Sequence, residues 1–247
     1  MLIPKETPKE DIPTKRDSHS PPPYAPSDPS SSFSGSSPVH PSGLKPSNYV
    51  SLNQNHHSVR GSYLLDPSLE IPQEFLVPLP DGQSEERRSN LHASSEHGSV
   101  STDIYLLDRP MAKSRKKILL TTSSTHGSVT TSIRRNGYLP AFDLKAESRN
   151  GYVSVKIPRT YRGMVTGTTK HGRVFMSDAV SAHSVIFSDV KGSKRMFFGD
   201  FSARNDDTDD AMVLESTHGS INIYFEDEDL TSPVVKSVKG FFGKMWN

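Results

Sequence analysis

The chain has 247 residues, 32% of them hydrophobic, with 29 Lys and Arg, 28 Asp and Glu and no Cys. Globular domains are usually closer to half apolar, so this fraction predicts a folded part joined to a disordered one. The absence of Cys excludes disulfides, thiolate metal sites and a cysteine nucleophile. The N-terminus does not resemble a signal peptide and no apolar run reaches 18 residues, so we expect an intracellular protein without a transmembrane segment.

The N-terminal region, residues 1–58, is rich in Pro and Ser and poor in β-branched residues. Such a segment cannot bury enough apolar surface to offset backbone ordering of about 1 to 2 kcal/mol per residue, which predicts a disordered arm. The arm carries one candidate ligand motif. A polyproline segment ending in Tyr is pre-organised for the aromatic groove of a WW domain, so a WW-domain protein is a candidate partner. The motif consists of Pro21, Pro22, Pro23 and Tyr24.

Residues 59–89 alternate Pro with apolar residues, which predicts an extended lead-in segment along a sheet edge. A β-repeat domain is expected over 90–230, where five similar units each place His-Gly or Asn-Gly between two alternating runs. We expect the glycines to supply positive φ angles at equivalent turns, and the apolar residue two positions later to face the core. The turn glycines are Gly98, Gly127, Gly151, Gly172 and Gly219, and the core residues are Val100, Val129, Val153, Val174 and Ile221.

Period-two alternation without intervening helical patterns predicts an all-β fold. Because the units resemble each other in sequence, we favour a β-solenoid, in which each unit is one rung. If each glycine instead closed a two-residue hairpin, the units would form an antiparallel sandwich or meander. That alternative stays open at the level of the sequence.

Three sequence features carry a resemblance to a known family: the segment 61–67 (Gly-Ser-Tyr-Leu-Leu-Asp-Pro), the segment 88–91 (Arg-Ser-Asn-Leu), and the repeated Ser-x-His-Gly-Ser-Val units. Together they resemble a fungal, mainly basidiomycete, domain family of unknown function. The turn motif is more distantly similar to bacterial putative-adhesin repeats. The resemblance covers roughly residues 60–228 and implies a β-solenoid fold, without implying an activity.

Charge is distributed unevenly along the chain. Residues 1–108 carry −6, residues 109–199 carry +13 and residues 200–247 carry −6. Unpaired buried charge is unfavourable, so we expect the basic side chains to face solvent as a stripe across the rungs. The stripe is either a solvated surface, a binding site for an anionic polymer or lipid headgroup, or a partner of the acidic runs 206–210 and 226–229. Its densest members are Lys113, Arg115, Lys116, Lys117, Arg134, Arg135, Arg159 and Arg162.

Other candidate sites are weak. His97, His126, His171 and His218 all lie in turns and would form one column in stacked rungs, but they lack the spacing and companions of metal ligands. The acidic loop 206–210 lacks the central Gly and terminal Glu of a calcium loop, and is read as a solvated insertion. No catalytic motif, cofactor or metal is predicted, and no specific nucleic-acid recognition is expected.

The last segment, 231–247, is the only helical signal. Ser232 and Pro233 suit a helix start, and seven apolar residues of the segment fall within about 140° of a helical wheel. We expect either a cap on the β domain or an interfacial helix that contacts a membrane. The whole pattern favours a non-enzymatic scaffold or interaction protein presenting a basic β-repeat surface. The alternative is a carbohydrate-active or polyanion-processing enzyme on the same scaffold.

Overall fold

The computed structural model describes residue 41 and residues 43–79, 84–109 and 117–228, all within one compact unit, Ser37–Asn247. Three sets of predictions lie outside the described residues: the Pro-Pro-x-Tyr motif at 21–24, the C-terminal helix, and the stripe residues Lys113, Arg115 and Lys116. The described part is nearly all β, as predicted, with strands in two sheets and little helix.

The seven-stranded sheet contains, in spatial order, β1 (Pro46–Ser47), β3 (Val59–Leu65), β5 (Val100–Leu106), β7 (Val129–Arg135), β9 (Val153–Ile157), β15 (Ile221–Phe225) and β11 (Val174–Met176). The eight-stranded sheet contains β12 (Ser184–Val190), β13 (Ser193–Phe198), β10 (Gly163–Thr169), β14 (Asp210–Ser216), β8 (Phe142–Ser148), β6 (Ile118–Ser124), β4 (Leu91–Ser95) and β2 (Val50–Gln54). The described helices are short: α1 (Asp178–Ala182) and the 3-10 turns η1 (Gln73–Phe75), η2 (Glu85–Arg87) and η3 (Phe201–Ala203).

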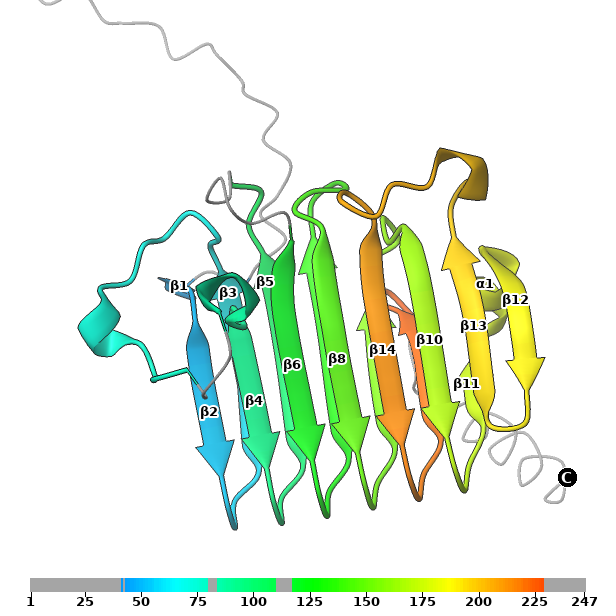
Figure 1. Cartoon of the computed structure of the whole chain (residues 1–247), viewed down its shortest axis with the longest axis horizontal. Helices are drawn as coiled ribbons and strands as arrows, with labels where there is room; N and C mark the ends of the chain where they lie inside the picture. The colour runs from blue at the N-terminus through cyan, green and yellow to red at the C-terminus, as the bar shows by residue number, and fades with distance from the viewer. Residues whose placement is uncertain (1–40, 42, 80–83, 110–116, 229–247) are drawn as a thin grey trace, which may run out of the picture. The chain divides into compact units, whose positions relative to one another are not determined.

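The chain alternates between the two sheets. Each turn containing one of the five glycines joins a strand of the eight-stranded sheet to a strand of the seven-stranded sheet, and these turns line one edge of the structure (Figure 1). Neighbouring strands in both sheets are parallel, except where β13 pairs with β10 and β12. The five glycine turns therefore do not close antiparallel hairpins. The turn at Gly192 does, because it joins the antiparallel strands β12 and β13 with a φ of +78°.

Spatial order departs from sequence order at two places, one of them the antiparallel pair β12 and β13, where β13 lies next to β10 and β12 at the edge. The last pair of strands, β14 and β15, inserts between β8–β9 and β10–β11, so Gly219 follows Gly151 in the stack and Gly172 comes after it. Parallel pairing on both sides of β14 holds the insertion, since Glu215 pairs with Glu147 of β8 and with Thr168 of β10.

The core lies between the sheets and follows the predicted alternation. Strands such as β8 and β9 bury every second side chain, and the apolar residues after the turn glycines pair in register from strand to strand. Val100, Val129, Val153 and Ile221 are buried, which confirms the prediction for these four. Val174 is only half-buried, because β11 is the last strand of its sheet.

The reason for the turn glycines differs from the prediction. None of the five has a positive φ. A Cβ atom at Gly151 would instead lie 2.5 Å from the carbonyl oxygen of Gly127, and one at Gly127 would meet the carbonyl of Gly98. Backbone cannot move aside as a flexible side chain can. Glycine is therefore required because successive turns stack backbone against backbone.

A hydroxyl ladder accompanies this stacking. The Ser or Thr three residues before each glycine donates to the carbonyl of the residue at the glycine position in the adjacent turn. Ser124 donates to Gly98 O at 2.8 Å, and its own oxygen accepts from the Gly127 N–H at 2.8 Å. Ser95, Ser148, Thr169 and Ser216 make the corresponding bonds to the neighbouring turn. The ladder explains why the repeated motif begins with Ser or Thr.

The domain boundaries need correction. The predicted arm ends at residue 58, but β1 and β2 begin at Pro46 and Val50, and β3 is an integral strand and not a lead-in. Val50 pairs with Leu91, and both Val50 and Leu52 pack against the core. These short alternating strands are hidden in the sequence because they directly follow a long Pro/Ser-rich stretch.

The expectation that the basic block faces solvent is wrong for Arg135. Its side chain is 1% exposed and forms a bidentate ion pair with Asp210, whose side chain is 2% exposed, at 2.8 and 2.6 Å. Asp210 also accepts from the Phe142 and Arg162 N–H groups, while Arg135 donates to the Pro140 and Thr160 carbonyls. Burial raises the pKa of Asp210, and pairing and hydrogen bonding of both charges offset that desolvation.

We predict that Gly151→Ala lowers the free energy of unfolding by more than about 1 kcal/mol and Gly151→Val by more, because the added atoms overlap the Gly127 backbone. Urea denaturation measures both changes. Gly61→Ala is the matched control, since its Cβ would meet only the movable ring of Tyr63. Equal losses at Gly61 and Gly151 would contradict the role of backbone stacking.

Arg135→Met is expected to lower the free energy of unfolding by about 3 to 5 kcal/mol, because it leaves Asp210 buried without its partner. The double variant Arg135→Met, Asp210→Leu should recover part of that loss in the same chemical denaturation. Arg134→Met, which changes a half-exposed neighbour 3.9 Å from Glu226, serves as the control, with a loss of about 1 kcal/mol or less. A loss at Arg135 no larger than the loss at Arg134 would refute the structural role of the buried pair.

Candidate functional site

The described members of the predicted basic stripe are paired within the chain. Lys117 lies 3.4 Å from Asp143, and Arg134 lies 3.9 Å from Glu226. Arg159 pairs with Asp227 at 3.0 Å, Arg162 with Asp209 at 3.1 Å, and Arg135 with Asp210. Four of these five acidic partners come from the acidic runs 206–210 and 226–229. The paired cations are therefore a poor candidate for a free anion-binding surface.

The acidic loop also has a structural role. Asp209 and Asp210 are buried, so reading the whole loop 206–210 as a solvated insertion is wrong for these two residues. The Asp209 carboxylate accepts from the Asn205 N–H at 2.8 Å besides pairing with Arg162. Nowhere in the described part of the chain do three or more His, Asp or Glu side chains cluster as metal ligands would.

The turn histidines stack in two groups along the column of turns, with Asn150 between them, and not as one continuous column of rings. The rings of His97 and His126 are 4.9 Å apart and nearly parallel, and His171 and His218 stack at the same distance. His56 stacks on His97 at 5.2 Å and extends the column by one turn. Sequence reasoning missed this turn because His57 occupies the glycine position there, although Ser58 and Val59 continue the motif.

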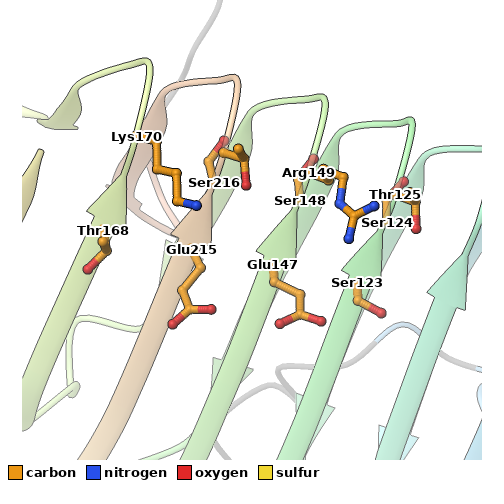
Figure 2. Close-up of a pocket in the computed structure, with 11 residues that line it drawn as sticks. Ser123, Ser124, Thr125, Glu147, Ser148, Arg149, Thr168, Lys170, Glu215 and Ser216 are labelled. Atoms are coloured by element: carbon orange, nitrogen blue, oxygen red, sulfur yellow. The ribbon is translucent and has the colours of Figure 1, made fainter.

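A polar groove lies beside this column on the outer face of the eight-stranded sheet (Figure 2). It has a volume of about 430 Å³ and crosses the ends of β6, β8, β14 and β10. Residues that alternate outward on neighbouring parallel strands fall into one row, because the strands are in register about 4.8 Å apart. That row consists of Ser123, Glu147, Glu215 and Thr168.

The groove has two levels of opposite charge. Glu147 and Glu215 lie side by side on the strands, while Arg149 and Lys170 project from the adjoining turns (Figure 2). The Lys145 ammonium lies 2.7 Å from Glu147, and a hydrogen bond to Glu147, aided by the charge of Glu215, raises the pKa of Lys145. Arg149 and Lys170 have no acidic partner among the described residues. The groove thus offers free cationic donors above a row of carboxylates.

Most groove serines are already engaged. Ser124, Ser148 and Ser216 donate to backbone carbonyls of the adjacent turns at 2.8, 2.8 and 3.0 Å. A hydroxyl held in such a bond is not poised as a nucleophile, and the described lining includes neither His nor an aromatic residue. The remaining groups suit hydrogen bonding and ion pairing with a bound molecule.

None of these groove residues was a candidate in the sequence. Glu147 and Glu215 are 68 positions apart in the chain, and they become neighbours only because β14 inserts beside β8. Arg149 and Lys170 belong to the predicted basic block but stand alone in the sequence, outside its dense clusters. The sequence feature that could have identified these two cations is their shared position, immediately before the His-Gly or Asn-Gly of a turn.

Two sheets of mainly parallel strands, with a groove on the outer face of the eight-stranded sheet, define a nearly all-β protein with a polar, mixed-charge outer face. The chain belongs to the family described as Domain of unknown function (DUF7330), whose model matches residues 48–228. A solved structure from Clostridium sporogenes, described as a putative cell adhesion protein, is similar at 13% identity with a TM-score of 0.41. The alignment covers 76% of this chain and 96% of that one. No curated protein matches the chain.

A membrane-crossing helix is not found in the described residues, where helices are short.

We predict that His97→Ala lowers the free energy of unfolding about twice as much as His171→Ala, because His97 stacks on two rings and His171 on one. Each exposed stack should contribute about 0.5 to 1 kcal/mol. Thermal or urea unfolding measures the losses. His97→Asn is the matched control, since Asn150 occupies the equivalent turn position. Indistinguishable losses for His97→Ala and His171→Ala would contradict the stacking.

Proposed function

We propose that this protein is a non-enzymatic interaction protein: a β-solenoid that binds an acidic polysaccharide across the groove of its eight-stranded sheet. Two features support the solenoid. The chain alternates between two parallel sheets, and equivalent turns stack with the same hydrogen bonds at each level. A rigid parallel sheet repeats its outer side chains at a fixed spacing, which suits a ligand that is itself a repeating polymer.

The class of ligand is inferred from one observation, which is that the groove contains both cationic and anionic side chains. Arg149 and Lys170 supply charge-assisted donors for the acidic groups of the polymer. Glu147 and Glu215 accept hydrogen bonds from its hydroxyls. A polyphosphate without free hydroxyl donors would meet the carboxylate row unfavourably, so the pattern favours a sugar acid over duplex nucleic acid.

The groove is also a better candidate for the binding site than the predicted basic stripe. The stripe residues that the structure describes each have a carboxylate of the chain nearby, whereas Arg149 and Lys170 have none among the described residues. Unpaired, exposed cations keep their charge available to a ligand.

Glycoside hydrolysis is the second candidate function, and the carboxylate pair is the observation that favours it. Neighbouring strand positions put the backbones of Glu147 and Glu215 about 5 Å apart, near the carboxyl separation of retaining glycosidases. The ion pair of Lys145 with Glu147 at 2.7 Å speaks against it, because it already occupies one oxygen of this carboxylate.

The test is titration calorimetry of the full chain with an acidic polysaccharide such as polygalacturonate. Arg149→Ala combined with Lys170→Ala should weaken binding by at least about tenfold, because charge-assisted hydrogen bonds contribute about 1.5 to 3 kcal/mol each. Arg60→Ala, which removes an exposed cation from the other sheet, should leave affinity unchanged.

Two results would refute the binding proposal: equal losses with Arg60→Ala, or binding of duplex DNA as tight as that of the polysaccharide. Release of reducing ends that Glu147→Gln or Glu215→Gln abolishes would instead establish hydrolysis.

A further inference from the structure

The outermost strand of the eight-stranded sheet has more exposed large apolar side chains than any other described strand. β12 ends the sheet, with β13 on one side and no strand on the other among the described residues. Val185, Ile186, Phe187 and Val190 are 54, 46, 51 and 64% exposed, so four of its seven residues are exposed apolar side chains. Natural sheets protect such an edge with charge or cover it, because bare apolar edges aggregate.

The opposite end of the same sheet shows the contrast. β2 presents Ser51, Asn53 and Gln54 to solvent, while its apolar residues Val50 and Leu52 pack against the core. The apolar character is therefore specific to the β12 end, and it calls for a cover there.

We propose that the C-terminal segment 232–247 of the same chain is that cover, docked along β12 as the amphipathic helix that its sequence predicts. The proposal does not depend on the function of the groove.

The first support is the place where the described chain ends. The Glu228 carboxylate accepts from Ser177 Oγ at 2.7 Å, and Ser177 is the N-cap of α1. α1 in turn leads directly into β12. Glu228 is thus held at the start of α1, the helix that precedes β12. Only residues 229–231 separate it from Ser232.

The second support is length. A helix over residues 232–246 would be about 22 Å long at 1.5 Å per residue. The seven residues of β12 extend over about 23 Å at 3.3 Å per residue. The segment is therefore long enough to cover the strand.

The third support is chemistry. The apolar arc of the segment contains three Val, two Phe, Met245 and Trp246, which match the aliphatic and aromatic side chains of the edge. Lys236, Lys239 and Lys244 lie outside that arc. The exposed carboxylate of Asp178 lies beside the apolar edge and complements this charge, whereas Asp189 is paired with Lys194 at 3.1 Å.

The first test uses the sole tryptophan of the full-length chain in lipid-free buffer. Docking predicts blue-shifted Trp246 emission protected from iodide. Ile186→Asp should shift the emission to the red and remove the protection, whereas Val213→Asp, an exposed apolar position on β14, should change neither. Red, fully quenchable emission in the unmodified chain would overturn the proposal.

The second test keeps the proposal falsifiable if Ile186→Asp fails to fold. The chain has no Cys, so Val185→Cys with Phe242→Cys provides a single pair. Oxidation should give an intramolecular disulfide in the monomer, and the control pair Val213→Cys with Phe242→Cys should not. Cross-linking only between two chains would assign the edge to a second copy. Trp246 protection that appears only with phosphatidylserine vesicles would assign the segment to membranes. Either result would overturn the proposal.

Discussion

The close approach of successive turns is the constraint on which the rest of the structure depends. At each level the glycine backbone lies against the carbonyl of the residue at the glycine position of the adjacent turn, and a Ser or Thr hydroxyl bridges the two turns. This contact sets the position of each turn relative to its neighbours. Once the turns are aligned, parallel pairing follows along both sheets, and the alternate apolar residues meet in one core.

The same alignment creates the polar groove. Outward-facing side chains on neighbouring parallel strands form rows. A side chain with no special feature in its own strand therefore becomes one member of such a row. Glu147 and Glu215 lie together because their strands are neighbours in register, and Arg149 and Lys170 flank them because both precede a turn. Such a site requires no special loop. It is a consequence of repetition with variation at outward positions.

Charge serves two purposes in this fold. In the dense basic clusters the described side chains are paired within the chain, and the Arg135–Asp210 pair links β7 to the start of β14 in the interior. This pair joins the inserted strand to its surroundings, where a purely apolar contact would specify the insertion less sharply. Arg149 and Lys170, which lack a carboxylate partner among the described residues, lie instead at turns, where solvent and ligands have access.

The sequence alone determined the all-β class, the repeated turns and most of the core, because these depend on local properties: period-two alternation, glycine in tight turns and a nearby hydroxyl. It did not determine why glycine is needed, since φ is local but the approach of Gly127 to Gly151 is not. Nor did it reveal the insertion of β14 and β15 between earlier strands, the burial of Arg135 or the groove. Each of these joins residues far apart in the chain, and only the tertiary pairing of strands brings them together.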